Sequence, residues 1–207
     1  MASQAAGNRS TLIVQLTDTH IVANARLCLN QIDTSSFLRA AVETVRTLTV
    51  RPDAVLITGD LVNEGRPNQY EHLKVLLAPL VSAEIPLYLM PGNHDSREAM
   101  REVFSDHHEL GTGASCDFVA DIGALRLIGL DTLVDNEAGG DLSENQLQWL
   151  ERTLQQKPER PTLIAMHHPP FATGIGHMDE QGLAADAGAA MERIVAAHPQ
   201  VERVTCG

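Results

Sequence analysis

The sequence is poor in cysteine, in positive charge and in long apolar runs, and each shortage excludes a class of protein. Its three cysteines, Cys28, Cys116 and Cys206, are an odd number without C-x-x-C spacing, so they predict neither a disulfide framework nor a zinc knuckle. No window approaches the roughly 20 apolar residues that span a bilayer, and the polar start lacks the features of a secretory signal. We therefore expect a soluble, cytoplasmic protein.

Positive charge is scarce, because 15 Lys and Arg residues stand against 27 Asp and Glu residues and leave a net charge of -12. No Lys/Arg cluster offsets this charge locally, so general nucleic-acid binding and binding to anionic membranes are not expected. If the substrate carries a phosphate group, bound metal ions must offset its charge in place of side-chain cations.

Short apolar runs alternate with amphipathic stretches, which is typical of strand, helix, strand units and predicts the α/β class. With 207 residues, 43% of them hydrophobic, one core is enough, so residues 11–207 are expected to form one domain behind a flexible segment, 1–10. Strands are expected at residues 11–17, 54–58, 87–90, 162–166 and 201–205, with a hairpin formed by 116–120 and 125–130. Helices are expected at 36–48, from 67 to about 79, around 97–104, after 143 and at 188–197.

Two of the expected helices carry finer predictions. The first has a cap at residues 34–36, and we expect the residues near helical spacing behind it to face the core: Phe37, Ala40, Ala41, Val45 and Leu48. Ser143 and Gln146 form a capping box that opens another helix.

Four of the expected strands run directly into polar clusters at their carboxyl ends. Ligands of open α/β sheets bind in the crevice outside those ends, so residues far apart in the sequence should converge on one site. The clusters, in chain order, are Asp18-Thr19-His20, Gly59-Asp60, Gly92-Asn93-His94-Asp95 and His167-His168.

The clusters supply carboxylate, imidazole and amide oxygen atoms without any thiolate, a donor set suited to zinc, manganese, iron or cobalt. Asp18 and His20 can turn toward the same ion, and the two oxygens of Asp60 can bridge a pair of ions. Such a pair clamps the oxygens of a phosphoryl displacement and generates hydroxide near neutral pH. A single Asp-x-His or Gly-Asp is usually a turn or a cap, so the prediction depends on the ordered set.

Together with Pro169-Pro170 after His168, these motifs resemble the successive signatures of calcineurin-like metallophosphoesterases. Residues 60–67 and 88–95 resemble more closely the bacterial class III cyclic-nucleotide phosphodiesterases and glycerophosphodiesterases. The resemblance spans residues 12–207 and implies an αββα sandwich with its metal site at the carboxyl ends of the strands. It also implies hydrolysis of 3',5'-cyclic AMP or glycerophosphodiesters with two divalent metal ions (Fe, Mn, Zn or Co), and homo-oligomers among full-length relatives.

The resemblance also implies a role for each site residue. His94 lies beside the scissile phosphate as a catalytic residue, and His168 is not a ligand. In the family a Gly-His-x-His segment completes the ligand sets of both ions, and Thr205-Cys206-Gly207 resembles the start of that segment. We therefore expect a domain that is incomplete at its C-terminus and binds its second ion poorly. The implied ligands are Asp18, His20 and Asp60 for the first ion and Asp60, Asn93 and His167 for the second.

Asn63, Arg66 and His177 are weaker candidates, for substrate binding, because they lie in segments that follow the ligands. Asp131 also ends a strand, and a turn-capping role is expected for it. Two other functions stay open. One is a phosphomonoesterase or nuclease on the same scaffold, and the other is an inactive or weakly active fragment that still folds.

Overall fold

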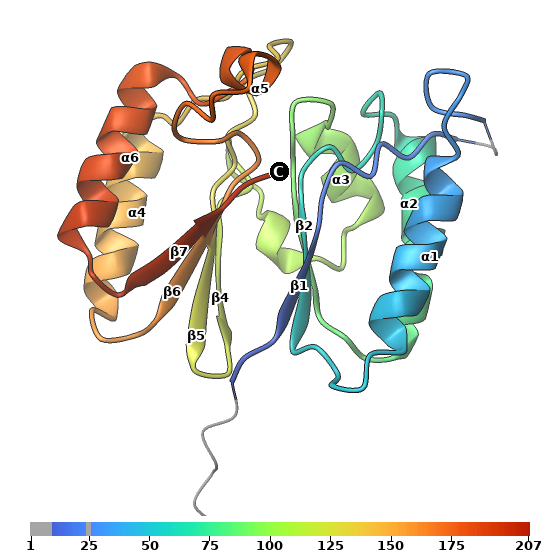
Figure 1. The fold of residues 1–207 in the computed structure, drawn as a ribbon, viewed down its shortest axis with the longest axis horizontal. Helices are drawn as coiled ribbons and strands as arrows, with labels where there is room; N and C mark the ends of the chain where they lie inside the picture. Colours follow the sequence, from blue (N-terminus) through green and yellow to red (C-terminus); the bar gives the residue numbers. More distant parts are fainter. Residues whose placement is uncertain (1–9, 24–25) are drawn as a thin grey trace, which may run out of the picture.

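A computed structural model describes residues 10–23 and 26–207, so nearly all of the expected flexible segment 1–10 lies outside the described residues. Two β-sheets face each other in the middle, and helices cover their outer faces (Figure 1). The strands are β1 (Ile13–Leu16), β2 (Ala54–Thr58), β3 (Leu87–Met90), β4 (Phe118–Ile122), β5 (Leu125–Gly129), β6 (Thr162–Ala165) and β7 (Val201–Thr205). The helices are α1 (Thr34–Arg46), α2 (Pro67–Ser82), α3 (Arg97–Val103), the 3-10 turn η1 (His108–Leu110), α4 (Glu144–Gln156), α5 (Gly176–Glu180) and α6 (Ala185–Ala197).

The first sheet contains three parallel strands in the order β1-β2-β3. Its central strand β2 is buried along its whole length, and successive side chains point to opposite faces. Val55 and Ile57 pack with side chains of α1 and α2, whereas Ala54 and Leu56 join the cluster between the two sheets. Because all three strands are parallel, their carboxyl ends meet at one edge.

The second sheet has the order β4-β5-β6-β7, with the predicted hairpin β4-β5 antiparallel and the remaining pairs parallel. Helices α4 and α6 cover its outer face, where Leu150 packs in one cluster with Met191 (Figure 1). On the inner face, Phe118 and Leu127 belong to the same cluster as Leu56 of the first sheet. The predicted α/β class and αββα sandwich are confirmed.

The capping box of α4 is confirmed in both directions. Ser143 Oγ accepts a hydrogen bond from the Gln146 backbone N–H, and Gln146 Oε1 accepts one from the Ser143 backbone N–H. No helix within the described ranges combines the length and apolarity that crossing a bilayer requires.

The predicted cap of α1 is wrong, and of its predicted buried face Val45 is confirmed while Phe37 and Leu48 are exposed. The helix begins at Thr34, and Asp33 Oδ1 accepts the Ser36 N–H at 3.0 Å. Leu38 is buried together with Val42 and Val45, while Phe37 is 70% exposed. Phe37 and Leu38 begin two stripes that both have helical spacing, and the branched aliphatic stripe is the one that packs on the first sheet.

Candidate dinuclear metal centre

The strand ends bring the predicted ligands to one edge of the sandwich. Asp18 and His20 follow β1, and Asp60 follows β2; His94 comes after β3 and His167 after β6. Donor atoms of His20, Asp60 and His94 lie within 4.8 Å of one another. The same limit holds for the donor atoms of Asp18, Asp60 and His167. Asp60 is therefore common to both groups.

The buried carboxylate of Asp60 lies between the two groups. Its Oδ2 is 3.5 Å from His20 Nε2, and its Oδ1 is 3.5 Å from His167 Nε2. The backbone N–H of His94 donates to the same Oδ1 at 2.9 Å. Burial alone would raise the pKa of Asp60, but hydrogen bonding to His167 and His94 holds that pKa below its usual value. One oxygen faces each group, as a carboxylate that bridges two ions requires.

His167 presents one defined nitrogen to its group. Its Nδ1 donates to the carbonyl oxygen of Thr58 at 2.8 Å, which leaves Nε2 facing Asn93 Oδ1 at 3.2 Å. A backbone carbonyl on the far nitrogen is a usual support of a metal-binding imidazole. Burial works against a charged ring, yet Asp60 beside it raises the pKa of His167 above its ordinary value. The close packing requires Gly59, because a Cβ there would lie 2.5 Å from His167 Nδ1.

Three of the predicted ligands have a backbone conformation that non-glycine residues rarely adopt. The φ angles are 53° at Asp18, 38° at His20 and 47° at Asp60. The chain is held there by hydrogen bonds between the loops, from Asp18 N–H to Gly59 O at 3.2 Å and from His20 N–H to Asp60 O at 2.9 Å. Conformations of this kind cost free energy and gather at functional sites, so they support the site at this edge.

The buried Asp95 joins two of the loops. It belongs to the Gly92-Asn93-His94-Asp95 cluster, but sequence reasoning alone assigned it no role. Asp95 Oδ2 accepts the N–H groups of Leu61 at 3.0 Å and Gly92 at 2.9 Å. Its Oδ1 accepts the hydroxyl of Tyr70 at 2.8 Å, and that hydroxyl in turn accepts the Ser96 N–H at 2.8 Å. Burial raises the pKa of Asp95 to about 6. Asp95 and Tyr70 thus hold the loops after β2 and β3 in register. The sequence feature that could have indicated this role is the position of Asp95 directly after His94.

We expect Tyr70→Phe to lower the free energy of unfolding by about 1–3 kcal/mol, because the Ser96 N–H and one Asp95 oxygen lose a buried partner. Denaturant unfolding measures this change. Tyr88→Phe is the matched control, since Tyr88 stacks on Phe118 with ring centroids 5.7 Å apart and its hydroxyl has no hydrogen bond to the described part of the chain. Equal stability of the Tyr70→Phe variant and the wild type would contradict a structural role for this hydroxyl.

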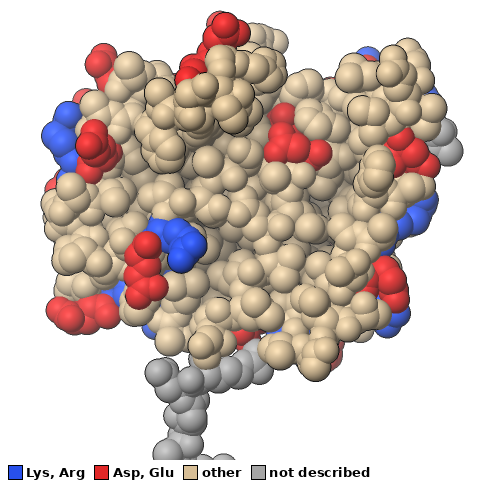
Figure 2. All heavy atoms as spheres, viewed as in Figure 1, with Lys and Arg blue, Asp and Glu red and all other residues tan. Residues whose placement is uncertain are grey.

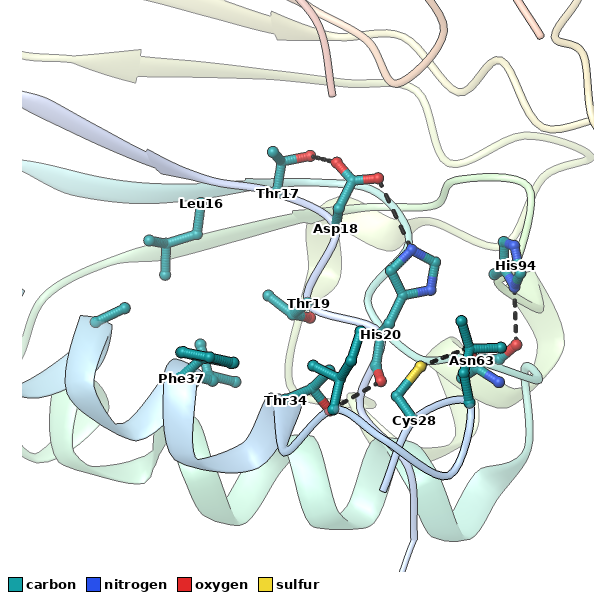
Figure 3. Close-up of a pocket in the computed structure, with 14 residues that line it drawn as sticks. Leu16, Thr17, Asp18, Thr19, His20, Cys28, Thr34, Phe37, Asn63 and His94 are labelled. Carbon is teal, nitrogen blue, oxygen red and sulfur yellow. Dashed lines mark hydrogen bonds and ion pairs between the residues drawn. The ribbon is translucent and has the colours of Figure 1, made fainter. Parts of the chain in front are cut away.

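His94 is exposed beside the metal-ligand candidates. Its Nδ1 donates to the carbonyl oxygen of Asn63 at 2.8 Å, so Nε2 is the free nitrogen. The ring meets His20 edge-on, with centroids 4.8 Å apart (Figure 3). This position suits either a group that faces the substrate or a further ligand, and the variants discussed below separate these roles.

The three predicted substrate contacts are placed differently. Asn63 lines the same cavity as His94 (Figure 3). Arg66 precedes α2 and pairs with Glu64 at 3.5 Å, with 64% of its side chain exposed. His177 is exposed on α5. Only Asn63 among the three lines that cavity.

Two further polar residues have structural roles. His168 is buried, and its Nδ1 and Nε2 bond to Thr132 Oγ1 at 2.7 Å and to Ala138 O at 3.2 Å. Burial lowers the pKa of His168 to about 4, so the ring is neutral near pH 7. Asp131 accepts the Leu133 N–H at 3.0 Å and pairs with Arg97 at 2.6 Å, in keeping with the expected turn-capping role.

The residue expected to open a Gly-His-x-His segment lies at the site. The N–H of Gly207 donates to the carbonyl oxygen of His167 at 2.9 Å. Gln15 Nε2 donates to the carbonyl oxygen of Cys206 at 2.9 Å and thereby fixes this segment to β1.

The sandwich, with a carboxylate shared by two candidate ligand groups at its strand ends, is the arrangement of a metallophosphoesterase. The family described as calcineurin-like phosphoesterase matches residues 11–206, and the chain belongs to that family. A solved structure, the purple acid phosphatase PPD1 of yellow lupin (Lupinus luteus), has the same fold at a TM-score of 0.53 and 15% identity, over 83% of this chain and 33% of that one.

Curated relatives extend the likeness. The chain is 34% identical over 172 residues to the probable glycerophosphodiester phosphodiesterase GpdQ of Arcobacter nitrofigilis, covering 83% of this chain and 62% of that protein. It is 34% identical over 203 residues to the 3',5'-cyclic adenosine monophosphate phosphodiesterase CpdA of Escherichia coli K12, covering 98% and 70%. It is 38% identical over 160 residues to a probable cyclic nucleotide phosphodiesterase of Rhodococcus erythropolis, covering 76% and 52%. The chain thus spans between 52% and 70% of the length of these relatives.

Proposed function

We propose that this protein is a metal-dependent phosphodiester hydrolase acting on 3',5'-cyclic nucleotides or glycerophosphodiesters. The observation that carries the proposal is the Asp60 carboxylate, which points one oxygen at each of two ligand groups. The names of the relatives from Arcobacter and Escherichia coli support a diester as the substrate.

The donor atoms fit two divalent ions of the manganese, iron, zinc or cobalt type. Asp18, His20 and Asp60 would hold the first, and Asp60, Asn93 and His167 would hold the second. These residues combine carboxylate, imidazole and amide oxygen, and the hydrogen bond from His167 to Thr58 already fixes the tautomer that a ligand needs. When bound, the ions would supply Lewis acidity to the phosphoryl oxygens and lower the pKa of a water molecule.

The chain itself would place the substrate and move one proton. On the face seen in Figure 2, Asp and Glu side chains outnumber those of Lys and Arg, which are scattered. No cluster of side-chain cations therefore takes up the phosphate charge on that face. With Nδ1 bound to the Asn63 carbonyl, a protonated His94 holds its mobile proton at Nε2. From that atom it would donate the proton to the leaving alkoxide.

Removal of metal with a chelator should abolish hydrolysis of bis(p-nitrophenyl) phosphate, and added Mn²⁺, Co²⁺ or Zn²⁺ should restore it. The same assay with p-nitrophenyl phosphate compares a diester with a monoester. A higher kcat/KM for the monoester would favour a phosphomonoesterase on the same scaffold. Undiminished turnover after exhaustive metal removal would contradict the proposed function.

A further inference from the structure

Gln15 on β1 carries a polar side chain on the face of the first sheet that looks toward the second sheet. Side chains alternate along a strand, and Ile13, two positions earlier, belongs to the apolar cluster between the sheets. Val14 and Leu16 pack on the other face, with the helices. Gln15 is exposed, and ordering a long exposed side chain costs conformational entropy. Protein partners on such a side chain therefore call for an explanation.

The amide of Gln15 uses all of its hydrogen-bonding groups on protein partners. Its Nε2 donates to Thr58 Oγ1 at 2.8 Å and to the carbonyl oxygen of Cys206 at 2.9 Å. Its Oε1 accepts the hydroxyl of Thr205 at 2.6 Å. The Cys206 carbonyl oxygen can only accept, so the nitrogen of the amide must face it and the orientation of the amide is defined. One side chain thus joins β1 to β2 and to the end of β7.

These partners lead to the candidate ligand His167. The carbonyl oxygen of Thr58 accepts the Nδ1–H of His167 at 2.8 Å. After β7 the chain runs toward the ends of β1 and β2 (Figure 1), and the N–H of Gly207, next to Cys206, donates to the His167 carbonyl oxygen at 2.9 Å. The ring and the backbone of His167 are therefore both held by segments that Gln15 holds.

Gly207 also lies directly on the hydrogen bond between His167 and Thr58. A Cβ at position 207 would collide with His167 Nδ1 and lie 2.6 Å from the Thr58 carbonyl oxygen. The backbone of Gly207 therefore covers this hydrogen bond. A hydrogen bond that is shielded from water is stronger and exchanges its proton more slowly than an open one. By holding the Cys206 carbonyl group, Gln15 keeps this cover in place.

From these contacts we infer that Gln15 is a positioning residue for the candidate metal centre. It keeps the backbone of Cys206 and Gly207 on the His167–Thr58 hydrogen bond, so that His167 keeps its proton at Nδ1 and presents Nε2 as a ligand. That Nε2 lies 3.5 Å from Asp60 Oδ1. Gln15 itself does not line the cavity beside His94 and contacts no substrate there. The inference rests on the proposed function for its effect on catalysis, but its effect on the imidazole needs no metal.

The test compares two substitutions of Gln15 in the metal-free protein. Gln15→Leu removes all three hydrogen bonds, whereas Gln15→Glu keeps the shape and places a carboxylate against the Cys206 carbonyl oxygen. ¹⁵N–¹H NMR of the neutral ring should find the proton of His167 at Nδ1 in wild type, in slow exchange with water. In both variants this signal should broaden or vanish. The ring proton of His168, which is donated to the Ala138 carbonyl oxygen, should stay sharp as an internal control.

Metal binding and turnover give the second readout. In Gln15→Leu the affinity of one site for Mn²⁺ should fall about 10-fold, the lower end of the effect of losing an outer partner of a metal ligand. The kcat for bis(p-nitrophenyl) phosphate should fall as well, with KM nearly unchanged, because Gln15 does not line the cavity.

Two matched controls remove similar groups elsewhere. Gln148→Leu removes an exposed glutamine on α4 that donates to Glu144 at 3.0 Å. Thr11→Val removes another bond between the two sheets, from the Thr11 hydroxyl to the Ile122 carbonyl oxygen at 3.4 Å, at the end away from the site. Neither control should change the His167 signal or the binding of Mn²⁺.

Several results would overturn the inference. They are a wild-type ring protonated at Nε2, an unchanged His167 signal in Gln15→Leu, or a sharp signal kept by Gln15→Glu. An equal loss of the His168 signal would show a general loosening of the fold and would also contradict it. So would an altered His167 signal without loss of affinity in a protein that binds Mn²⁺.

The metal-free measurement separates this inference from the proposed function. If wild type binds no metal and cleaves no diester, but the His167 signal depends on Gln15, the positioning role stands and the proposed function fails. If wild type is a metal-dependent diesterase and neither the His167 signal nor the affinity for Mn²⁺ responds to Gln15→Leu, the proposed function stands and the positioning role fails.

Discussion

Asp60→Asn is expected to lower the rate of diester hydrolysis about 10³-fold or more. Loss of a residue that only hydrogen-bonds to a metal ligand already lowers metal affinity or activity about 10–100-fold. The substitution removes a negative oxygen from a side chain that faces both His20 and His167. Both metal sites should therefore lose affinity at once. Measurements of kcat and of metal content on the same preparations show this directly.

Two further carboxylate variants calibrate this result. Asp18→Asn removes a proposed ligand of the first ion only, beside His20 Nε2 at 3.9 Å, so the first site should weaken more than the second. Asp186→Asn, on the exposed start of α6, should change neither metal content nor rate. An Asp60→Asn protein with full metal content and full rate would place the bridging ligand elsewhere.

His94→Ala is expected to lower the rate about 10²–10⁴-fold while metal content stays nearly intact. The reason is geometric: the Nδ1 of His94 is held by the Asn63 carbonyl, and the free Nε2 lines the cavity beside Asp18 and His20. If Nε2 protonates the leaving alkoxide, the defect should shrink with an activated aryl leaving group, which needs less protonation. Rates on cyclic AMP and on bis(p-nitrophenyl) phosphate give the two values.

His108→Ala is the control for a general effect of removing an exposed imidazole, because His108 in η1 neither lines the cavity nor belongs to either candidate ligand group. The donor atoms of His94 are also close enough to His20 and Asp60 for metal binding. A large loss of metal in His94→Ala, without a separate defect in rate, would make His94 a ligand and remove it from the role of proton donor.

The convergence of the candidate site residues at one edge could be predicted because they are local continuations of strands. The apolar runs before Asp18, Asp60 and His94 are β1, β2 and β3, and parallel pairing alone brings their ends together. The hairpin and the capping box of α4 were predictable for a similar reason, since turn and cap residues act within a few positions of the chain.

The parts that escaped prediction depend on packing between segments distant in sequence. Nothing near Tyr70 indicates that its hydroxyl meets Asp95 and the Ser96 N–H. Likewise, the choice between the stripes that begin at Phe37 and Leu38 is made by the sheet beneath α1 and not by helical spacing. That choice leaves Phe37 on the wall of the cavity.

The central claim is that Asp60 joins two ions, and an electron paramagnetic resonance titration of the wild-type protein with Mn²⁺ tests it most directly. Two Mn²⁺ ions that share a carboxylate lie about 3.5–4 Å apart and couple magnetically. The account predicts that a multiline spectrum of a coupled pair, with hyperfine spacing narrower than that of a single ion, grows in as the second equivalent binds. Only the six-line signal of isolated Mn²⁺, up to saturation, would contradict it.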